Sequence, residues 1–293
     1  MWDGHYRARA QYFNSLSLSN TNANAEGAAA LIDHRARLQP GWLMSDKVGL
    51  FAQLDLLPYT LWGDEALQLS DPAYGDDPLI LSGAVQPPTT EDGGATHQNI
   101  QITRLFGEVH TGVGQVRFGR MPLEWGSGML LNAGNAPNQE FGDTVDRVQF
   151  TGRAGQVYLQ GGLETNVEQF VNEDDDVWSL TGSVLYKTEQ AGAGIYNIYR
   201  RYNHDGETFG MYTLDIWGAA QAGPLSIETE FVAQLGRGDL GDGVNDASIN
   251  AFGAMLDAGY TLDRIRLGLA GGLATGDKDT TDDNFKTFTF DRD

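Results

Sequence analysis

The chain has 293 residues, 38 of them glycine, and its 40 acidic residues outnumber its 19 basic residues to give a formal net charge of −21. It contains no cysteine, which excludes disulfides and cysteine-based metal sites or nucleophiles. The acidic excess argues against a nucleic-acid partner, because a phosphate backbone needs a basic face. No stretch approaches the roughly 18 consecutive apolar residues of a transmembrane helix, although the alternating strands of a membrane barrel need no such stretch.

Polar and apolar residues alternate along most of the chain with the two-residue period of β-strands. In the first such segment Tyr6 and Tyr12 fall on one face, and Arg7 and Arg9 fall on the other. In chain order, the pattern predicts strands at residues 4–16, 33–43, 48–57, 99–110, 115–122, 144–150, 156–165, 176–187, 193–202, 208–222, 225–235, 249–262, 264–275 and 285–290. Most of these segments are long enough for a tilted membrane crossing.

The connections between the predicted strands alternate in length. Those at residues 17–32, 58–98 and 123–142 are long and polar, while the connections between them are short turns. Short turns at one end of the strands and long loops at the other are typical of outer-membrane barrels. A soluble sandwich usually has shorter strands and no such rhythm. The sequence therefore predicts an all-β fold, a transmembrane antiparallel up-and-down β-barrel with about 14 strands visible.

The barrel prediction carries expectations for the domain and for the tryptophans. Residues 1–293 are expected to form a single barrel domain that lacks its closing strands, because the chain stops just as a new strand begins near Phe290 and an open edge is a hazard in a bilayer. Trp42, Trp125 and Trp178 lie near strand ends, where they would supply aromatic girdles. The alternative is that these tryptophans are core residues of a soluble protein.

Alternation also predicts which side chains face the lumen. If the apolar face of each strand meets lipid, the pore-lining residues are Arg7, Arg9, Arg35, Arg37, Arg104, Glu108, Arg117, Arg147, Glu164, Glu228 and Glu230. Bases dominate the first six strands, and acids are more frequent from the seventh strand on. A basic wall opposite an acidic wall sets a transverse field that favours small polar solutes. Alternatively, the charges pair and fill the interior, and both interpretations can hold at once.

The loop at residues 123–142 is the predicted constriction of the pore. It contains Glu124, Trp125, Asn132 and Asn135 together with four glycines, which allow a close backbone approach. Its amides suit hydrogen bonding to hydroxyl-rich solutes. The alternative is an ordinary exposed loop on the surface of the protein.

No catalytic constellation stands out, so the protein is not expected to be an enzyme. The five histidines lack metal-ligand spacing such as HExxH, and no GxSxG or Walker pattern occurs. No cofactor is expected. Acidic runs at residues 173–176, 239–246 and 277–283 either serve solubility or bind divalent cations beside anionic lipid head groups.

The most specific motifs of the chain are Val116-Arg117-Phe118-Gly119-Arg120-Met121-Pro122, Trp125-Gly126, Gly128-Met129-Leu130, Asn132, Gly134-Asn135 and Gly142-Asp143-Thr144-Val145-Asp146-Arg147. With residues 34–40 and 53–57, they give a chain that resembles an uncharacterised family of myxobacterial and related outer-membrane β-barrels. It is more distantly similar to alginate-export and porin-type barrels, which share a strand ending in Gly-Arg. The resemblance implies the outer membrane of a Gram-negative bacterium. Its alginate-export part implies that Arg104, Arg117 and Arg147 contact an anionic polysaccharide.

The first functional hypothesis is a porin-like channel for passive or weakly selective passage of small polar or anionic solutes, including saccharides. The alternative is a structural or surface-binding barrel with a plugged lumen that acts as a subunit of an envelope assembly. The expected partners are outer-membrane lipid, lipopolysaccharide and a small solute, and the alternative adds envelope proteins or a homo-oligomer. An enzyme at the barrel rim is the third and least favoured hypothesis.

Overall fold

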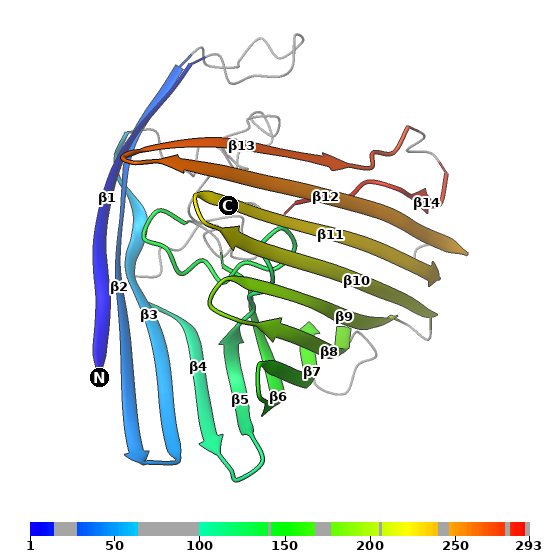
Figure 1. The fold of residues 1–293 in the computed structure, drawn as a ribbon, viewed down its shortest axis with the longest axis horizontal. Helices are drawn as coiled ribbons and strands as arrows, with labels where there is room; N and C mark the ends of the chain where they lie inside the picture. The colour runs from blue at the N-terminus through cyan, green and yellow to red at the C-terminus, as the bar shows by residue number, and fades with distance from the viewer. Residues whose placement is uncertain are drawn as a thin grey trace, which may run out of the picture. The chain divides into compact units, whose positions relative to one another are not determined.

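The computed structural model describes residues 1–14, 28–63, 100–139, 142–167, 177–204, 207–239, 246–278 and 282–290. Their secondary structure consists of β-strands joined by turns and loops (Figure 1). Among the described residues no helix is long and apolar enough to cross a membrane. The prediction of an all-β chain is therefore confirmed.

The strands form one sheet in sequence order from β1 to β13, and β14 pairs with β12 beside this path. Consecutive strands are antiparallel, as in the β5/β6 and β9/β10 pairs. The strands are β1 (Trp2–Asn14), β2 (Ala28–Ser45), β3 (Val48–Gly63), β4 (Ile100–His110), β5 (Gln115–Pro122), β6 (Thr144–Ala154), β7 (Val157–Val167), β8 (Val177–Lys187), β9 (Ala191–His204), β10 (Glu207–Ala222), β11 (Leu225–Gly238), β12 (Ala247–Leu262), β13 (Ile265–Ala274) and β14 (Asn284–Phe285). The up-and-down order is the one that the sequence predicts.

Most predicted strands match the observed ones within a few residues, but β2 begins five residues earlier and β3 ends six residues later than predicted. A further difference is at the end of the chain. The pattern predicts a crossing strand at residues 285–290, whereas β14 covers only Asn284–Phe285 and runs parallel to β12. The following Phe288 is buried in a hydrophobic cluster, and its backbone N–H donates to the carbonyl of Thr275 at 2.9 Å. The alternating phenylalanines have the two-residue period of a strand, but Phe288 instead packs in this hydrophobic cluster.

The chain divides into two compact units. Unit 1 contains Met1–Leu43, Leu50–Leu105 and Asn135–Glu140, and therefore β1 and most of β2 to β4. Unit 2 contains Met44–Gly49, Phe106–Gly134 and Phe141–Asp293, and therefore β5 to β14.

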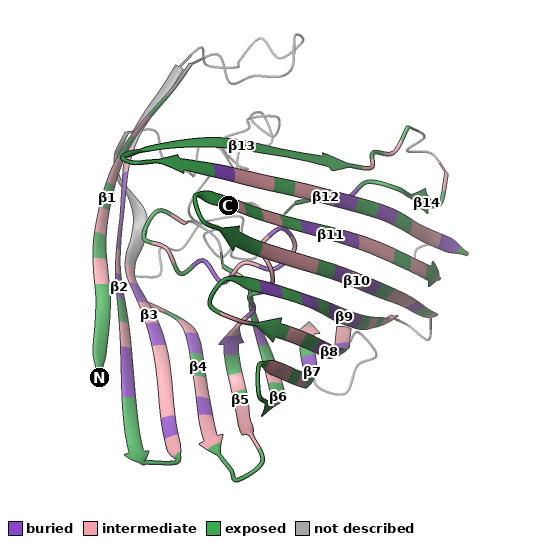
Figure 2. Cartoon of the chain, in the orientation of Figure 1, coloured by how far each residue is buried: buried purple, intermediate pink, exposed green. Residues whose placement is uncertain are grey.

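In unit 2 the exposed face of the sheet is apolar and the opposite face is polar and buried. Alternate residues along β10 to β12 change between exposed and buried (Figure 2). The exposed residues include Leu163, Leu180, Ile195, Ile216, Phe231 and Phe252. The buried ones include Glu164, Ser179, Thr181, Thr213, Asp215 and Glu230. This arrangement reverses that of a soluble protein and is the one that a membrane barrel requires. We call the buried polar face of the strands the inner face.

This orientation can be tested on β8 with two substitutions on the same exposed face. We expect Leu180→Arg, near the middle of the strand, to lower the free energy of unfolding by about 2–4 kcal/mol, because it places a charge near the bilayer midplane. Tyr186→Arg, at the end of β8, is the control and should cost about 0–1 kcal/mol near the interface. Urea unfolding of protein refolded in lipid vesicles measures both. Equal costs at the two positions would contradict a lipid-facing surface.

Candidate functional site: the charged inner face and its loop

Five arginines predicted to line the lumen lie in unit 1: Arg7, Arg9, Arg35, Arg37 and Arg104. Arg7 and Arg9 both bind Asp33, with N–O distances of 3.0 and 3.1 Å. Arg37 binds Asp55 in a bidentate ion pair: Nε donates to Oδ1 at 2.7 Å and Nη2 donates to Oδ2 at 2.9 Å. The strand register places Arg7 opposite Arg35 and Arg9 opposite Asp33. Two arginines directly opposite each other repel, so the aspartates are needed to hold this face together.

The remaining two arginines of unit 1 bind the second part of the predicted constriction loop. Arg35 Nη2 donates to the carbonyl of Gln139 at 2.8 Å, and Arg104 Nη1 donates to Asn135 Oδ1 at 2.7 Å. Arg7 Nη1 also donates to the carbonyl of Pro137 at 3.3 Å. Within unit 1, residues 135–139 therefore lie against the arginines of the inner face.

Unit 2 pairs its predicted lumen charges across neighbouring strands. Glu108 accepts from Arg117 at 2.9 Å and from His110 at 2.6 Å. Arg147 and Glu164 lie directly opposite each other on β6 and β7, and their side chains are 3.2 Å apart. Glu164 is 2% exposed, so this second pair is almost fully removed from solvent. The interpretation that interior charges pair with one another is confirmed for these residues.

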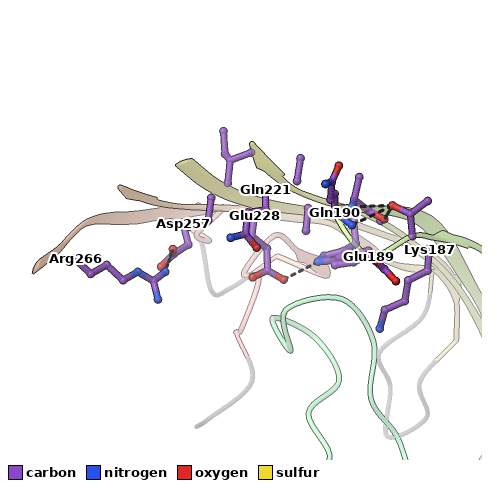
Figure 3. A pocket seen from close by; sticks show the side chains of 15 residues that line it. Lys187, Glu189, Gln190, Gln221, Glu228, Asp257 and Arg266 are labelled. Carbon is purple, nitrogen blue, oxygen red and sulfur yellow. Dashed lines mark hydrogen bonds and ion pairs between the residues drawn. The ribbon is translucent and has the colours of Figure 1, made fainter. Parts of the chain in front are cut away.

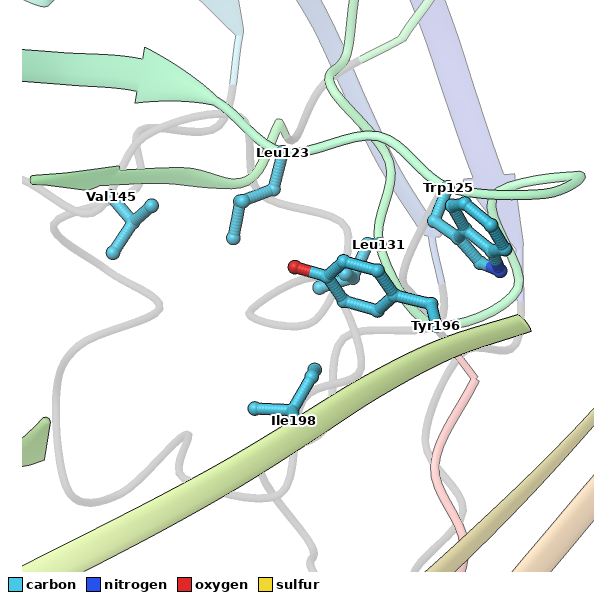
Figure 4. Packing of buried hydrophobic residues seen from close by; sticks show 6 residues of the cluster. All are labelled: Leu123, Trp125, Leu131, Val145, Tyr196 and Ile198. Carbon is cyan, nitrogen blue, oxygen red and sulfur yellow. The ribbon is translucent and has the colours of Figure 1, made fainter. Parts of the chain in front are cut away.

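Residues 123–134, which we call the docked loop, pack on the inner face of unit 2. Leu123, Trp125 and Leu131 form a hydrophobic cluster with Tyr196 and Ile198 of β9, and these side chains point toward one another (Figure 4). The indole of Trp125 stacks on the ring of Tyr196, with centroids 5.2 Å apart and planes at 26°. The alternative of an ordinary exposed loop is wrong for this segment.

The tip of the docked loop continues over the next strands. Met129 is buried against Val232 of β11, Ala251 of β12 and Phe288. Leu130 packs against both this cluster and the cluster around Trp125. The docked loop therefore covers the inner face of β9, β11 and β12 within unit 2.

A carboxylate of the strand wall holds the docked loop by polar contacts. Glu230 of β11 is fully buried, and its Oε2 accepts hydrogen bonds from the backbone N–H of Ser127 at 2.6 Å and from Ser127 Oγ at 2.5 Å. Gly126 has a φ of 60°, and a Cβ at this position would overlap the Glu230 carboxylate. Only glycine allows the backbone to come this close to Glu230.

The predicted loop residues differ in what they do. Trp125 is buried, Glu124 is exposed, and Asn135 binds Arg104. Asn132 stabilises the loop itself, because its Oδ1 accepts from the N–H of Gly134 at 3.0 Å. Sequence reasoning missed Asp33, Gly126 and Ser127 as site residues. A serine between two glycines, directly after a tryptophan, was the available signal for Gly126 and Ser127.

Glu228 lines a pocket of about 340 Å³ near the short turns of unit 2 (Figure 3). Its Oε1 accepts from Trp217 Nε1 at 2.8 Å. On the same pocket wall, Asp257 and Arg266 form a loose ion pair at 3.8 Å. Glu228 and Glu230, although two residues apart on one strand, therefore have different partners: Glu228 binds Trp217, which packs against the cluster around Trp125, and Glu230 binds Ser127.

The structure describes only part of the three acidic runs. Residues 173–176 lie outside the described part of the chain. Asp246 binds Arg237 at 2.8 and 3.0 Å, and this hydrogen-bonded pair lowers the pKa of the Asp246 carboxyl. Among the described residues no group of three or more His, Asp or Glu side chains is placed to hold a metal ion. The divalent-cation hypothesis stays a prediction.

Comparison with known proteins gives matches among solved structures only. No protein-family model matches the chain, and a search of curated proteins finds no match. An anion-selective porin from Comamonas acidovorans matches 94% of this chain over 79% of its own, with 11% identity and a TM-score of 0.54. OccAB1 from Acinetobacter baumannii matches 92% of this chain over 64% of its own, with 10% identity and a TM-score of 0.55. The chain has the fold of an outer-membrane porin. The predicted resemblance to porin-type barrels is confirmed at the level of the fold.

Proposed function

We propose that this protein is a porin-like channel of the outer membrane through which small polar or anionic solutes pass passively. One observation carries the proposal: the sheet exposes an apolar face, buries a charged face, and the docked loop lies on the charged face of unit 2. A polar interior narrowed by a loop is how a barrel admits small solutes and excludes large ones. The similarity in fold to an anion-selective porin supports the same function.

The charges of unit 1 favour anions as the solute. Among its described residues, the five arginines of the inner face accompany two buried aspartates, Asp33 and Asp55. An excess of positive charge along a pore raises the local concentration of anions. A saccharide or an anionic polysaccharide would be a more specific solute. Of the three arginines assigned to it by resemblance, Arg117 and Arg147 bind Glu108 and Glu164, and Arg104 binds Asn135.

Planar bilayer recordings test the channel. We expect discrete conductance steps when the purified protein is added, and a reversal potential of the sign for anion preference under a KCl gradient. A barrel that inserts without conducting would contradict the proposal and favour the plugged structural barrel. Purification in mild detergent would then show whether envelope proteins accompany it.

Arg104 should contribute to the charge preference. We expect Arg104→Gln to lower the anion-to-cation permeability ratio, because it removes one positive charge from a buried position on the inner face. The matched control is Arg237→Gln, whose side chain is 75% exposed at the end of β11. Reversal potentials of both variants under the same gradient measure the effect. An equal shift in both variants would contradict a specific role for Arg104.

A further inference from the structure

Two carboxyl groups lie side by side beneath the docked loop. Asp215 of β10 is paired in register with Val232 of β11, and Glu230 lies two residues from Val232 on the same face. Both side chains are 0% exposed. Asp215 is close enough to Glu230 for the two carboxyl groups to interact electrostatically and by a side-chain hydrogen bond.

The oxygens of this pair are only partly satisfied by the surrounding protein. Glu230 Oε2 accepts both hydrogen bonds from Ser127. Glu230 Oε1 and both oxygens of Asp215 are buried and have no hydrogen-bond donor in the described part of the chain. Trp125 lies next to Asp215, although its indole N–H makes no hydrogen bond of good geometry. A buried carboxylate oxygen without a donor is costly, and the cost calls for a proton or another donor.

No cation neutralises the pair among the described residues. Charged and titratable groups on the surrounding elements include Glu124 in the docked loop, Arg147 on β6, Tyr196 and Arg200 on β9, Glu228 on β11 and Asp257 on β12. The two arginines have other partners, because Arg147 binds Glu164 and Arg200 Nε donates to Ser179 Oγ at 3.1 Å. The groups that act on Asp215 are Glu230 and Trp125. Two ionised carboxylates would therefore repel each other in a buried site.

We infer that Asp215 and Glu230 form a proton-binding site that fastens the docked loop to the inner face. One proton shared between them satisfies both groups: the Asp215 O–H donates to Glu230 Oε1, and the charge that remains on Glu230 accepts from Ser127. The loop contacts this site directly through Trp125, Gly126 and Ser127. In its consequence for conductance, the inference rests on the proposed channel function.

The direction of the pH response follows from the number of protons bound. The docked state holds the shared proton, whereas a released loop leaves both carboxyl groups in water, where they ionise. Raising the pH therefore favours release. Because one proton is lost on release, the ratio of docked to released loop falls by about tenfold for each pH unit in the range where the released carboxyl groups are ionised and the docked pair still holds its proton. The ratio levels off at the higher pH at which the docked pair also ionises. We expect the loop to be fastened in acid and released in alkali.

Thiol labelling measures release without any conductance. The chain has no cysteine, so Ala133→Cys places a single thiol in the docked loop at a position that is 1% exposed. Val113→Cys, in an exposed turn, is the reference and corrects for the ionisation of the thiol itself. We expect the labelling rate of Ala133→Cys relative to Val113→Cys to rise by about tenfold per pH unit in the range where the docked pair holds its proton and the released carboxyl groups are ionised. A ratio that stays constant between roughly pH 5 and pH 9 would overturn the inference.

Amide variants identify the groups that bind the proton. Asp215→Asn carries a permanent N–H donor toward Glu230. It should keep the labelling rate of Ala133→Cys relative to Val113→Cys low at every pH. Glu230→Gln still accepts from Ser127 through its amide oxygen and should also remove the response, so it serves if Asp215→Asn fails to fold. A normal pH response in either folded variant would overturn the assignment.

Conductance recorded in the same buffers separates this inference from the proposed function. A pH-dependent labelling ratio in a barrel that never conducts supports the proton site and contradicts the channel. Conductance together with a labelling ratio that is independent of pH supports the channel and overturns the proton site. When both are correct, conductance rises over the pH range in which labelling rises.

Discussion

Replacement of Trp125 by alanine is expected to release the docked loop and to raise the single-channel conductance. The indole is 7% exposed, stacks on Tyr196, and lies so close to Gly194 of β9 that a Cβ there would come within 2.7 Å of the ring. Truncating a buried tryptophan typically costs about 3–5 kcal/mol. Applied to loop docking, even the lower value changes the ratio of docked to released loop more than a hundredfold, at about tenfold per 1.4 kcal/mol.

Two measurements check this expectation. Single-channel recording should show larger steps for Trp125→Ala than for the unchanged protein, and limited proteolysis should cut within residues 123–142. The control is Trp178→Ala on β8, whose indole contacts Tyr199 of β9 edge to face, away from the docked loop. Cleavage of Trp125→Ala with unchanged conductance would show that the docked loop does not narrow the conducting path.

The strand pattern was predictable because burial on one face leaves a two-residue period in the sequence. Arg7 and Arg9 alternate with apolar residues, and the structure places both on the inner face. The bounds of β5 match the predicted ones because Gly114 and the sequence after Pro122 end the alternation sharply. The same reasoning failed at residues 285–290, where alternation reflects the packing of Phe288 and not a crossing strand. Periodicity records which side chains are buried but not which element covers them.

For the candidate site, the sequence predicted the face on which a side chain lies but not the residues that it contacts. The alternation of residues placed Glu230 on the inner face, but its partner comes from a distant part of the chain. Ser127 is 103 residues from Glu230 in sequence, and no local pattern marks that contact. Glu228 lies on the same face of β11 as Glu230, yet it binds Trp217 and not the docked loop. Alternation assigns a face, while the path of a loop across that face depends on packing that only the structure shows.

Replacement of Arg147 by methionine is expected to destabilise the barrel by about 3–5 kcal/mol, because removing the ion-pair partner leaves Glu164 buried with only the electrostatic interaction of Arg200 to compensate its charge. The remaining Glu164 is 2% exposed, and its other hydrogen bond, from Thr181 Oγ1, is long at 3.4 Å. The arginine stem and a methionine side chain are both long and unbranched, so the change in packing is small compared with the change in charge. Urea unfolding of protein refolded in lipid vesicles measures the loss.

A second ion pair of the same sheet provides the control. Arg120 binds Asp146 at 2.6 Å, but the two side chains are 54% and 49% exposed, so Arg120→Met should cost no more than about 1 kcal/mol. The double variant Arg147→Met, Glu164→Gln should recover most of the stability lost in Arg147→Met, because it removes the uncompensated charge. Equal losses for Arg147→Met and Arg120→Met would mean that water reaches Glu164 from the lumen. In that case the paired charges of β6 and β7 would lie along a hydrated path and would be available to a passing solute.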